Sequence, residues 1–418
     1  MAFFDYHEGQ FYAENVALEK IAQQVQTPVY CYSASALRHN YQTYIKHFKP
    51  ENSQVCYAVK ANTNQAIIGL LAKMGSGADV VSEGELRRAL QAGIPAEKIV
   101  FSGVAKTSRE MRFALQQGIF QFNVESEPEL ELLNEVALSM GKTAPVAVRI
   151  NPDIDAHTHA KISTGKASNK FGIAWSSIPA TYARAAELAG IRVQGIDLHI
   201  GSQLTELAPF EQAFNCLAEL TGVLRAQGHE ISVLDIGGGL GISYEVDGPQ
   251  PPELADYAAL ANNILGGLGC RILVEPGRSM VGNTGILLSE VIYLKRGERD
   301  EFLIIDAGMN DLLRPSMYDA YHEILAVEPA SGEHRAFQVV GPICETGDTF
   351  AYGRQLPPLQ SGDLVAIMNA GAYGAVMAST YNTRPLVPEV LVDDDRFMVI
   401  RKRPGYDEII GLDTALAE

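Results

Sequence analysis

The sequence contains few cysteines and no arrangement of them that would indicate a cross-linked or zinc-bound protein. Its 418 residues include five cysteines, namely Cys31, Cys56, Cys216, Cys270 and Cys344. They are odd in number, widely spaced and without a Cys-x-x-Cys pair, which argues against a disulfide framework and against a structural zinc site. The His-Glu-x-x-His motif is also absent. We therefore expect no metal ion in this protein.

Basic residues and long apolar runs are scarce as well. There are 33 Lys and Arg residues against 50 Asp and Glu residues, which gives a formal net charge of -17. Such a charge repels polyanions, so we expect neither nucleic acid nor an anionic membrane surface as a partner. No apolar run is long enough to span a bilayer, and the first residues have no basic region. These absences predict a cytoplasmic protein.

What is present is a regular alternation of apolar strand-like runs with helix-like segments, such as Gln65–Lys73 and Ser108–Gln117. Alternating strands and helices predict an α/β fold with a parallel sheet, and eight repeats over this length predict a closed (β/α)8 TIM-type barrel. The eight strand-like runs are Val55–Val59, Ala78–Val81, Ile99–Phe101, Phe122–Val124, Val146–Ile150, Val193–Leu198, Val233–Ile236 and Ile272–Val274.

After Arg278 the pattern changes to β-rich runs separated by Gly/Pro turns, without regular helices between them. The runs are Gly285–Lys295, Phe302–Ile305, Ala336–Val340, Leu364–Met368 and Phe397–Arg401. They predict an antiparallel β domain, a β-sandwich or β-barrel, which we expect the N-terminal hairpin to join. The predicted boundaries are 27–279 for the barrel and 1–26 with 280–418 for the β domain.

The carboxyl ends of barrel strands carry the polar residues from which an active site can be built. Lys60 follows the first strand, and His199–Gln203 follows the sixth. Asp235–Gly241 closes the seventh strand and Glu275–Ser279 the eighth. Because parallel strands end on the same side of a barrel, we expect these residues to lie at one rim.

Three consecutive glycines, Gly237, Gly238 and Gly239, follow the seventh strand. Without Cβ atoms, such a turn can present backbone N–H groups to an anion, and late barrel loops often bind phosphate. The same glycines could instead serve tight packing, and the sequence leaves both interpretations open. The spacing does not follow Gly-x-Gly-x-x-Gly, so NAD is disfavoured.

A lysine opposite a phosphate-binding turn indicates pyridoxal phosphate, which is held through a Schiff base to lysine and through its phosphate. Glu275 is placed to pair with the ring nitrogen and keep it protonated, although a strand-end salt bridge would also explain it. His199 could lie flat on the ring, or it could be a core histidine with satisfied nitrogens. We therefore expect a pyridoxal phosphate site in the barrel.

Seven polar motifs are spread over nearly the whole chain, namely Tyr57–Asn62, His199–Gln203, Gly237–Gly239, Glu275–Arg278, Arg314–Tyr318, Cys344–Asp348 and Ala372–Gly374. With these motifs taken together, the chain resembles the meso-diaminopimelate decarboxylase family, of the alanine-racemase-type, fold type III pyridoxal phosphate-dependent decarboxylases. Cys-Glu-x-Gly-Asp with Arg-Pro-Ser-x-Tyr is the narrower signature. The resemblance implies decarboxylation of meso-2,6-diaminopimelate to L-lysine and carbon dioxide, the last step of lysine biosynthesis.

The resemblance also implies roles for individual residues. Lys60 would bind the cofactor covalently and His199 would stack on its ring. The remaining cofactor-binding residues implied by the family are Ser202, Gly237, Gly238, Gly239, Glu275, Gly277, Arg278 and Tyr373.

On the substrate side, the family resemblance and the residue chemistry agree. Arg278 and Arg314 carry planar guanidinium groups suited to the distal carboxylate, and Tyr318 and Tyr373 add hydroxyl groups. A charged clamp on the departing carboxylate would stabilise the ground state and slow its loss. Glu345 is then the expected partner of the distal ammonium group of this small amino-acid substrate.

Cys344 lies in a polar loop bounded by Gly and Pro, beside Glu345. A thiol can return a proton to the carbanion left after carbon dioxide departs, and Lys60 is the other candidate for that step. The resemblance implies a homodimer in which Cys344 and Glu345 complete the site of the neighbouring subunit.

Other functions on the same fold stay open at this point. They are decarboxylation of carboxynorspermidine, ornithine or arginine, and a non-catalytic role in binding pyridoxal phosphate. A racemase is disfavoured because Glu275 stands where an arginine is expected opposite the ring nitrogen. The charged residues of the predicted β domain argue against a simple cofactor carrier.

Overall fold

The computed structural model describes residues 3–49, 51–155, 161–162, 164–166, 168–245, 248, 250–328, 331–414 and 416. The chain forms two compact units. The barrel unit comprises Arg38–Ser243 and Pro249–Met280, and the β unit comprises Met1–Leu37, Tyr244–Gly248 and Val281–Glu418.

The barrel unit contains eight parallel strands that close on themselves, which confirms the predicted barrel. The order of neighbours is β9-β11-β12-β13-β5-β6-β7-β8, and β8 pairs with β9 to close the ring. The strands are β5 (Ser53–Ala58), β6 (Gly77–Val80), β7 (Ile99–Phe101), β8 (Gln121–Val124), β9 (Ala144–Asn151), β11 (Ile191–Leu198), β12 (Val233–Asp235) and β13 (Arg271–Val274). A short extra strand, β10 (Ile173–Ala174), pairs with β9; two residues are too few to leave an alternating pattern.

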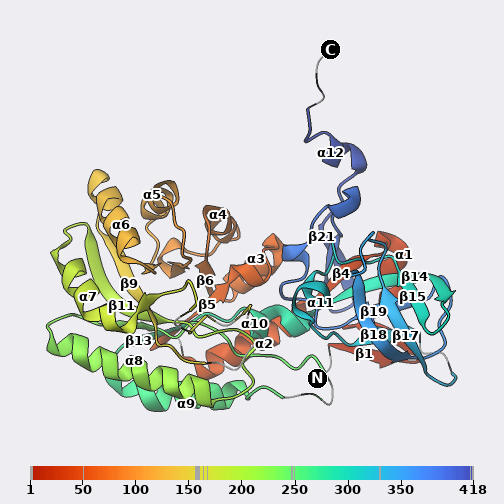
Figure 1. Cartoon of the computed structure of the whole chain (residues 1–418), viewed down its shortest axis with the longest axis horizontal. Coiled ribbons are helices and arrows are strands. Elements are labelled where there is room, and N and C mark those ends of the chain that lie inside the picture. Colours follow the sequence, from red (N-terminus) through yellow and green to blue (C-terminus); the bar gives the residue numbers. More distant parts are fainter. Residues whose placement is uncertain are drawn as a thin grey trace. The chain divides into compact units, whose positions relative to one another are not determined.

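Helices of the barrel unit lie around its strands (Figure 1). They are α3 (Gln65–Lys73), α4 (Glu83–Gln91), α5 (Ser108–Gln117), α6 (Glu127–Ser139), α7 (Ile178–Glu187), α8 (Ala208–Ala226), α9 (Leu254–Leu265) and the short α10 (Arg278–Val281). Their starts follow from the sequence: Thr107 and Glu110 form a capping box at α5, and Ser126 caps α6. Helix α5 buries Met111 and Ala114, which lie three residues apart on one face.

The interior of the barrel contains side chains from different strands in contact with one another. Cys56, Val100, Val233 and Leu273 form one buried cluster, with Phe120 packed against it. These apolar residues leave the polar groups to the carboxyl ends of the strands, as expected for a filled barrel.

The β unit contains a three-stranded sheet and a nine-stranded sheet. The first comprises β1 (Phe4–His7), β2 (Gln10–Ala13) and β3 (Val16–Ala17). The second comprises β4 (Val29–Ser33), β14 (Gly285–Arg296), β15 (Glu301–Ile305), β16 (Ile324–Ala326), β17 (Arg335–Val340), β18 (Thr349–Leu356), β19 (Leu364–Ile367), β20 (Glu389–Asp393) and β21 (Arg396–Arg401). The helices assigned to this unit are α1 (Leu18–Val25), α11 (Arg314–Tyr318) and α12 (Tyr406–Ile410).

The larger sheet is mixed, which corrects the expectation of a purely antiparallel domain. Strand β15 runs parallel to β17, and β4 runs parallel to β20. Parallel neighbours need a long connection. The residues between β15 and β17 supply one, and the whole barrel lies between β4 and β20 in the sequence.

The N-terminal boundary also differs from the predicted one at residue 26. Strand β4 pairs with both β14 and β20, so the chain leaves the β unit after Leu37, within helix α2 (Ala34–His47). The expected hairpin forms its own small sheet, but Phe11 and Ala13 pack in one core with Ile286 and Val390. The N-terminal segment is therefore part of the β unit, as predicted.

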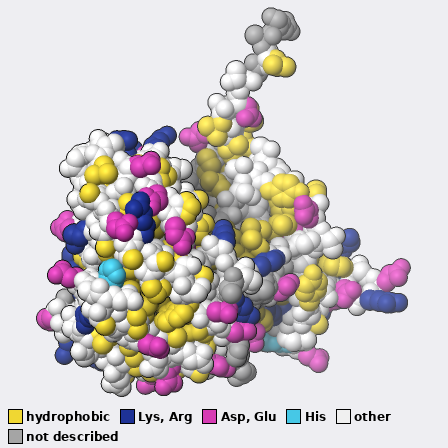
Figure 2. Space-filling model, turned by 60° about the vertical axis from the view of Figure 1, so that its left-hand side comes forward, with side chains coloured by type: hydrophobic (Ala, Val, Ile, Leu, Met, Phe, Trp, Pro, Cys, Tyr) yellow, Lys and Arg dark blue, Asp and Glu magenta, His cyan; other side chains and the backbone are white. Residues whose placement is uncertain are grey.

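The surface and the helices give two further observations. Acidic and basic side chains are interspersed on the face shown in Figure 2. Within the ranges that the structure describes, no helix is both long and apolar enough to cross a membrane.

Candidate active site

Lys60 lies in a 3-10 turn, Val59–Ala61, because strand β5 ends at Ala58, slightly earlier than predicted. Its Nζ is 2.8 Å from Oδ2 of Asp79. Asp79 is fully buried on the neighbouring strand β6, and its Oδ1 has no partner among the described residues. The ion pair therefore positions the lysine amine at the carboxyl end of the barrel.

The glycine turn is required by close approach of the backbone to its neighbours. Gly237 and Gly239 have φ angles of 61° and 111°, in the region that favours glycine. A Cβ at Gly237 would lie 2.6 Å from Nδ1 of His199, and one at Gly238 would lie 2.3 Å from the carbonyl oxygen of Glu275. The packing interpretation of these glycines is thus supported by the structure.

Two of the three glycine N–H groups are used within the protein. The N–H of Gly237 donates to Asp235 Oδ1 at 3.1 Å, and the N–H of Gly238 donates to His199 Nδ1 at 3.1 Å. Only the N–H of Gly239 has no acceptor recorded in the described part of the chain. The turn therefore offers an anion fewer backbone donors than the sequence suggested.

His199, which follows β11, is held as a neutral imidazole. Because its Nδ1 accepts from Gly238, a neutral ring carries its proton on Nε2. Burial, together with the positive charges of Arg149 and Lys60, lowers the pKa of His199 well below its ordinary value. A neutral, half-buried ring is suited to stacking on an aromatic ligand.

Glu275 is buried directly after β13, and its backbone N–H donates to the carbonyl oxygen of Gly237 at 2.7 Å. Burial, and then the neighbouring charge of Asp235, raise the pKa of Glu275 well above its ordinary value. Its Oε1 is buried and has no partner among the described residues. A buried acceptor of this kind costs free energy unless a ligand donor reaches it.

Ser202 and Arg278 also meet in the barrel unit. Nη2 of Arg278 donates to Ser202 Oγ at 3.3 Å. Arg278 begins the short helix α10, and Gly277, which precedes it, accepts from the N–H of Met280 at 3.1 Å. The structure therefore brings Ser202, Gly277 and Arg278 to the same end of the barrel as Glu275.

Arg314 and Tyr318 lie on α11 in the β unit. Arg314 is buried, and its Nη1 is 3.0 Å from His322 Nε2. Its guanidinium group lies over the ring of Tyr244, 4.6 Å from the ring centroid. Nδ1 of His322 lies 2.7 Å from the carbonyl oxygen of Met368. His322 and Tyr244, which fix the arginine, were missed from the sequence because they are distant from it or outside the quoted motif.

The loop that carries Cys344 is held by Asp348. Asp348 is buried, and its carboxylate accepts from the N–H groups of Met309 and Ile343, each at 2.6 Å. Carboxylate acceptors of two backbone donors are strong anchors. The Asp348 side chain is therefore one anchor of this loop.

Cys344 and Glu345 themselves are exposed. The N–H of Cys344 donates to Asn382 Oδ1 at 3.3 Å, and the hydroxyl of Tyr381 donates to Glu345 Oε1. Tyr381 and Asn382 were missed by sequence reasoning, since nothing local connects them to a loop almost forty positions earlier. Both candidate residues are thus oriented by the 381–382 turn.

Tyr373 adopts a backbone conformation that is unusual for its type. Its φ is 55°, in the left-handed region, and its side chain is half-buried. Such conformations cost on the order of 1–3 kcal/mol and are concentrated at functional sites. No signal in the sequence indicated this strain.

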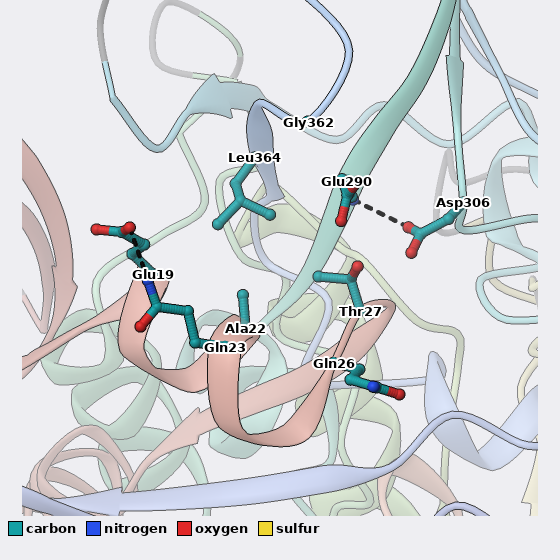
Figure 3. Close-up of a pocket in the computed structure, with 9 residues that line it drawn as sticks. All are labelled: Glu19, Ala22, Gln23, Gln26, Thr27, Glu290, Asp306, Gly362 and Leu364. Atoms are coloured by element: carbon teal, nitrogen blue, oxygen red, sulfur yellow. Dashed lines mark hydrogen bonds between the residues drawn. The ribbon is translucent and has the colours of Figure 1, made fainter.

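A cavity of about 540 Å³ lies elsewhere in the β unit (Figure 3). The N–H of Glu290 donates to Asp306 Oδ1 at 2.9 Å, and Gln23 donates to Glu19 at 2.8 Å. None of the residues singled out from the sequence lines it. Among the described residues, no group of three or more His, Cys, Asp or Glu side chains could hold a metal ion.

Comparison with known proteins decides the family. A family model described as "Pyridoxal-dependent decarboxylase, pyridoxal binding domain" matches residues 34–282. The diaminopimelate decarboxylase of Zymomonas mobilis is 50% identical over 97% of both chains, and that of Pseudomonas aeruginosa is 47% identical over 99% of both. The chain belongs to the diaminopimelate decarboxylase family.

Solved structures of diaminopimelate decarboxylases share the fold of this family member. The M. jannaschii enzyme in complex with L-lysine superposes with a TM-score of 0.95 and 38% identity, covering 100% of this chain and 99% of that one. The Helicobacter pylori enzyme, also complexed with L-lysine, has a TM-score of 0.91 and 42% identity, covering 94% and 98%. The predictions of the fold and of the cofactor, pyridoxal phosphate, are confirmed.

The residues of this diaminopimelate decarboxylase family member fit pyridoxal phosphate. Glu275 Oε1 is a buried acceptor without a partner among the residues that the structure describes, and it is suited to a protonated ring nitrogen. Lys60 provides the amine, and Gly239 has a backbone N–H free of recorded acceptors in the described chain. The donor set and the narrow glycine turn therefore agree with a phosphorylated aromatic cofactor.

Proposed function

We propose that this protein decarboxylates meso-2,6-diaminopimelate to L-lysine and carbon dioxide, using pyridoxal phosphate. The observation that carries the proposal is identity to diaminopimelate decarboxylases of 43% or more over nearly the full length of both chains. The gathering of Lys60, His199 and Glu275 at the carboxyl end of one barrel supports it.

In this proposal, the cofactor supplies an electron-withdrawing ring that stabilises the carbanion formed when carbon dioxide leaves. Lys60 holds the cofactor covalently and Asp79 orients its amine. Neutral His199 packs on the ring, and Glu275 accepts from the ring nitrogen. Ser202, Gly277 and Arg278, with Gly237–Gly239 and Tyr373, hold the phosphate and the adjacent substrate edge.

The substrate is selected by the residues of the β unit. Arg314, with Arg278, binds the distal carboxylate, and Tyr318 and Tyr373 donate hydroxyl hydrogen bonds. Glu345 binds the distal ammonium group. The departing carboxylate is left without a cationic clamp, so its charge is not stabilised in the ground state.

A proton returns to the α-carbon from Cys344 or from Lys60. The exposure of Cys344 and Glu345 in the single chain supports a homodimer in which they complete the neighbour's site. All five cysteines are free thiols, which supports a cytoplasmic location.

The test is carbon dioxide release from meso-diaminopimelate, compared with lysine, ornithine, arginine and carboxynorspermidine. We expect release from meso-diaminopimelate to exceed that from every other compound. Preference for ornithine or arginine would assign another decarboxylase activity. Release from none of them, with cofactor bound, would refute a decarboxylase of this substrate class.

A further inference from the structure

Two cavities of the β unit share part of their walls. The first has a volume of about 540 Å³ and lies beside helix α1 (Figure 3). The second has a volume of about 480 Å³. Gln26, Thr27 and Asp306 line both cavities, so the two adjoin each other. None of the residues that line them has a role in the function proposed above.

The second cavity is lined by two guanidinium groups, those of Arg384 and Arg403. Among the described residues, both donate only to backbone carbonyl oxygens. Nη2 of Arg384 donates to Asp306 at 2.6 Å, and Nη2 of Arg403 donates to Gln26–Pro28 at 3.3, 3.1 and 3.0 Å. Nε of Arg384 is buried and has no partner in the described part of the chain. Because an unpaired buried donor costs free energy, this cavity favours an anionic ligand group.

The first cavity is lined by three carboxylates. Glu19 lies on one side of it, and Glu290 and Asp306 lie on the other (Figure 3). Glu19 accepts from the neutral amide of Gln23 at 2.8 Å, and Asp306 accepts from the hydroxyl of Ser289 at 2.6 Å. No ion pair of these carboxylates with Lys or Arg is recorded within the described ranges. This cavity therefore favours an ammonium group.

Carboxyl groups outnumber guanidinium groups in the two cavities. Asp311 also lines the second cavity, where its oxygens accept from the N–H of Gly308 at 2.9 Å and from Nδ2 of Asn310 at 2.8 Å. Burial raises the pKa of Asp311 to about 7, so this group is only partly charged near neutral pH. The three carboxylates of the first cavity still exceed the two guanidinium groups of the second. A complementary ligand therefore carries more ammonium groups than carboxylates.

We propose that the two cavities together bind a basic amino acid, a small molecule with one carboxylate and two ammonium groups. The ligand carboxylate accepts from Arg384 and Arg403, and the ammonium groups donate to the carboxylates of the first cavity. A diamine would leave the guanidinium groups unpaired, and a simple carboxylic acid would leave the carboxylates unpaired. The inference goes beyond the proposed function, because it concerns a second site built from other residues.

Binding is measured at the site itself, by fluorine NMR of the full chain labelled with fluorotyrosine. Tyr406 is exposed and lines the second cavity, and Tyr406→Phe assigns its resonance. The probe is L-lysine, and cadaverine, which is lysine without its carboxylate, is the matched ligand. We expect a saturable shift with L-lysine and at least about tenfold weaker affinity for cadaverine. The exposed Tyr293, which lines neither cavity, should not respond. No saturable shift, or equal affinities, would overturn the proposal.

Variants then test the two ends of the ligand. Glu290→Gln should weaken both L-lysine and cadaverine by about tenfold, because each loses a partner of its ammonium group. Glu298→Gln, an exposed carboxylate outside both cavities, is the control. Arg403→Gln should reduce the affinity for L-lysine to that for cadaverine, without weakening cadaverine. Melting curves show whether Arg403→Gln folds, and Glu290→Gln decides if it does not. Unchanged affinity for L-lysine in Glu290→Gln would refute the site.

A variant of the proposed active site separates the two sites. Glu345→Gln should leave the titration of Tyr406 by L-lysine unchanged. Loss of the Tyr406 shift in this variant would mean that L-lysine acts from the active site, and would overturn a second site. The titration needs no turnover, so failure of the decarboxylase assay leaves its result interpretable.

Discussion

The candidate residues of the barrel unit and those of the β unit are held in different ways. In the barrel, Lys60, His199 and Glu275 each form a hydrogen bond to a residue at a neighbouring strand end, and they are buried or half-buried. In the β unit, Cys344 and Glu345 are exposed on a loop. The difference indicates that the proposed cofactor side is preorganised by strand ends, whereas the proposed substrate side depends on the anchors of a loop.

The largest effect is expected for Lys60→Ala, in the barrel set of Lys60, His199 and Glu275. Loss of the covalent anchor should lower decarboxylation by at least about 10³-fold, the scale of removing an essential proton-transferring group. Carbon dioxide release and cofactor content are measured together. The control is Lys73→Ala, at an exposed position of α3, which should leave both unchanged. Activity within tenfold of the unaltered protein would show that the barrel set is not the cofactor anchor.

The next largest effect is expected in the exposed set, Cys344 and Glu345. Cys344→Ser replaces a thiol with a much weaker acid, so kcat should fall on the order of 10²-fold with little change in cofactor binding. Cys216→Ser, on helix α8, is the control and should be nearly silent. An unchanged kcat would assign the proton return to Lys60 instead. In either case the measurement separates the roles of the two units.

The barrel could be predicted because each of its repeats carries local signals. Strand-like apolar runs are followed by caps such as Ser126 and by the Thr107–Glu110 capping box, so propensity and pattern agree. The strand-end rule then placed Lys60, His199 and Glu275 together without knowledge of any contact. Asp79 was missed because its pairing with Lys60 depends on the register of two neighbouring strands.

The β unit was harder to predict because its pairings join distant segments. Strand β4 lies between β14 and β20 in the sheet, although both partners follow it by more than 250 residues in the sequence. No local sequence pattern indicates this pairing. The positive φ of Tyr373 and the contact of Arg314 with His322 are likewise set by tertiary structure. The roles of Arg314, Cys344 and Glu345 came from resemblance and stay predictions.

Glu345→Gln tests the proposed substrate side, because it removes a negative charge and keeps the volume of the side chain. A lost charge-assisted hydrogen bond is worth about 1.5–3 kcal/mol, so kcat/KM for meso-diaminopimelate should fall roughly 10–100-fold. Cofactor affinity should stay unchanged. Glu298→Gln, another exposed carboxylate of the β unit, serves as the control. Equal loss of cofactor affinity and substrate affinity would contradict the assigned role.

The smallest effect concerns the anchor of the exposed loop, Asp348. In Asp348→Asn, one carboxylate oxygen becomes an NH2 group that faces a backbone N–H, so one of the hydrogen bonds from Met309 or Ile343 is lost. The loss of about 1–1.5 kcal/mol should lower kcat/KM by several-fold through the loop that carries Cys344.

A matched control for the anchor is Asp363→Asn. Asp363 likewise holds a turn of the β unit, since its Oδ2 accepts from the N–H of Gln360 at 2.7 Å. Both variants should lower the melting temperature, but only Asp348→Asn should lower kcat/KM. If the two variants reduce activity in proportion to their loss of stability, the loop has no specific anchoring role. If only Asp348→Asn lowers kcat/KM, the exposed loop is preorganised too, by a buried carboxylate and not by strand ends.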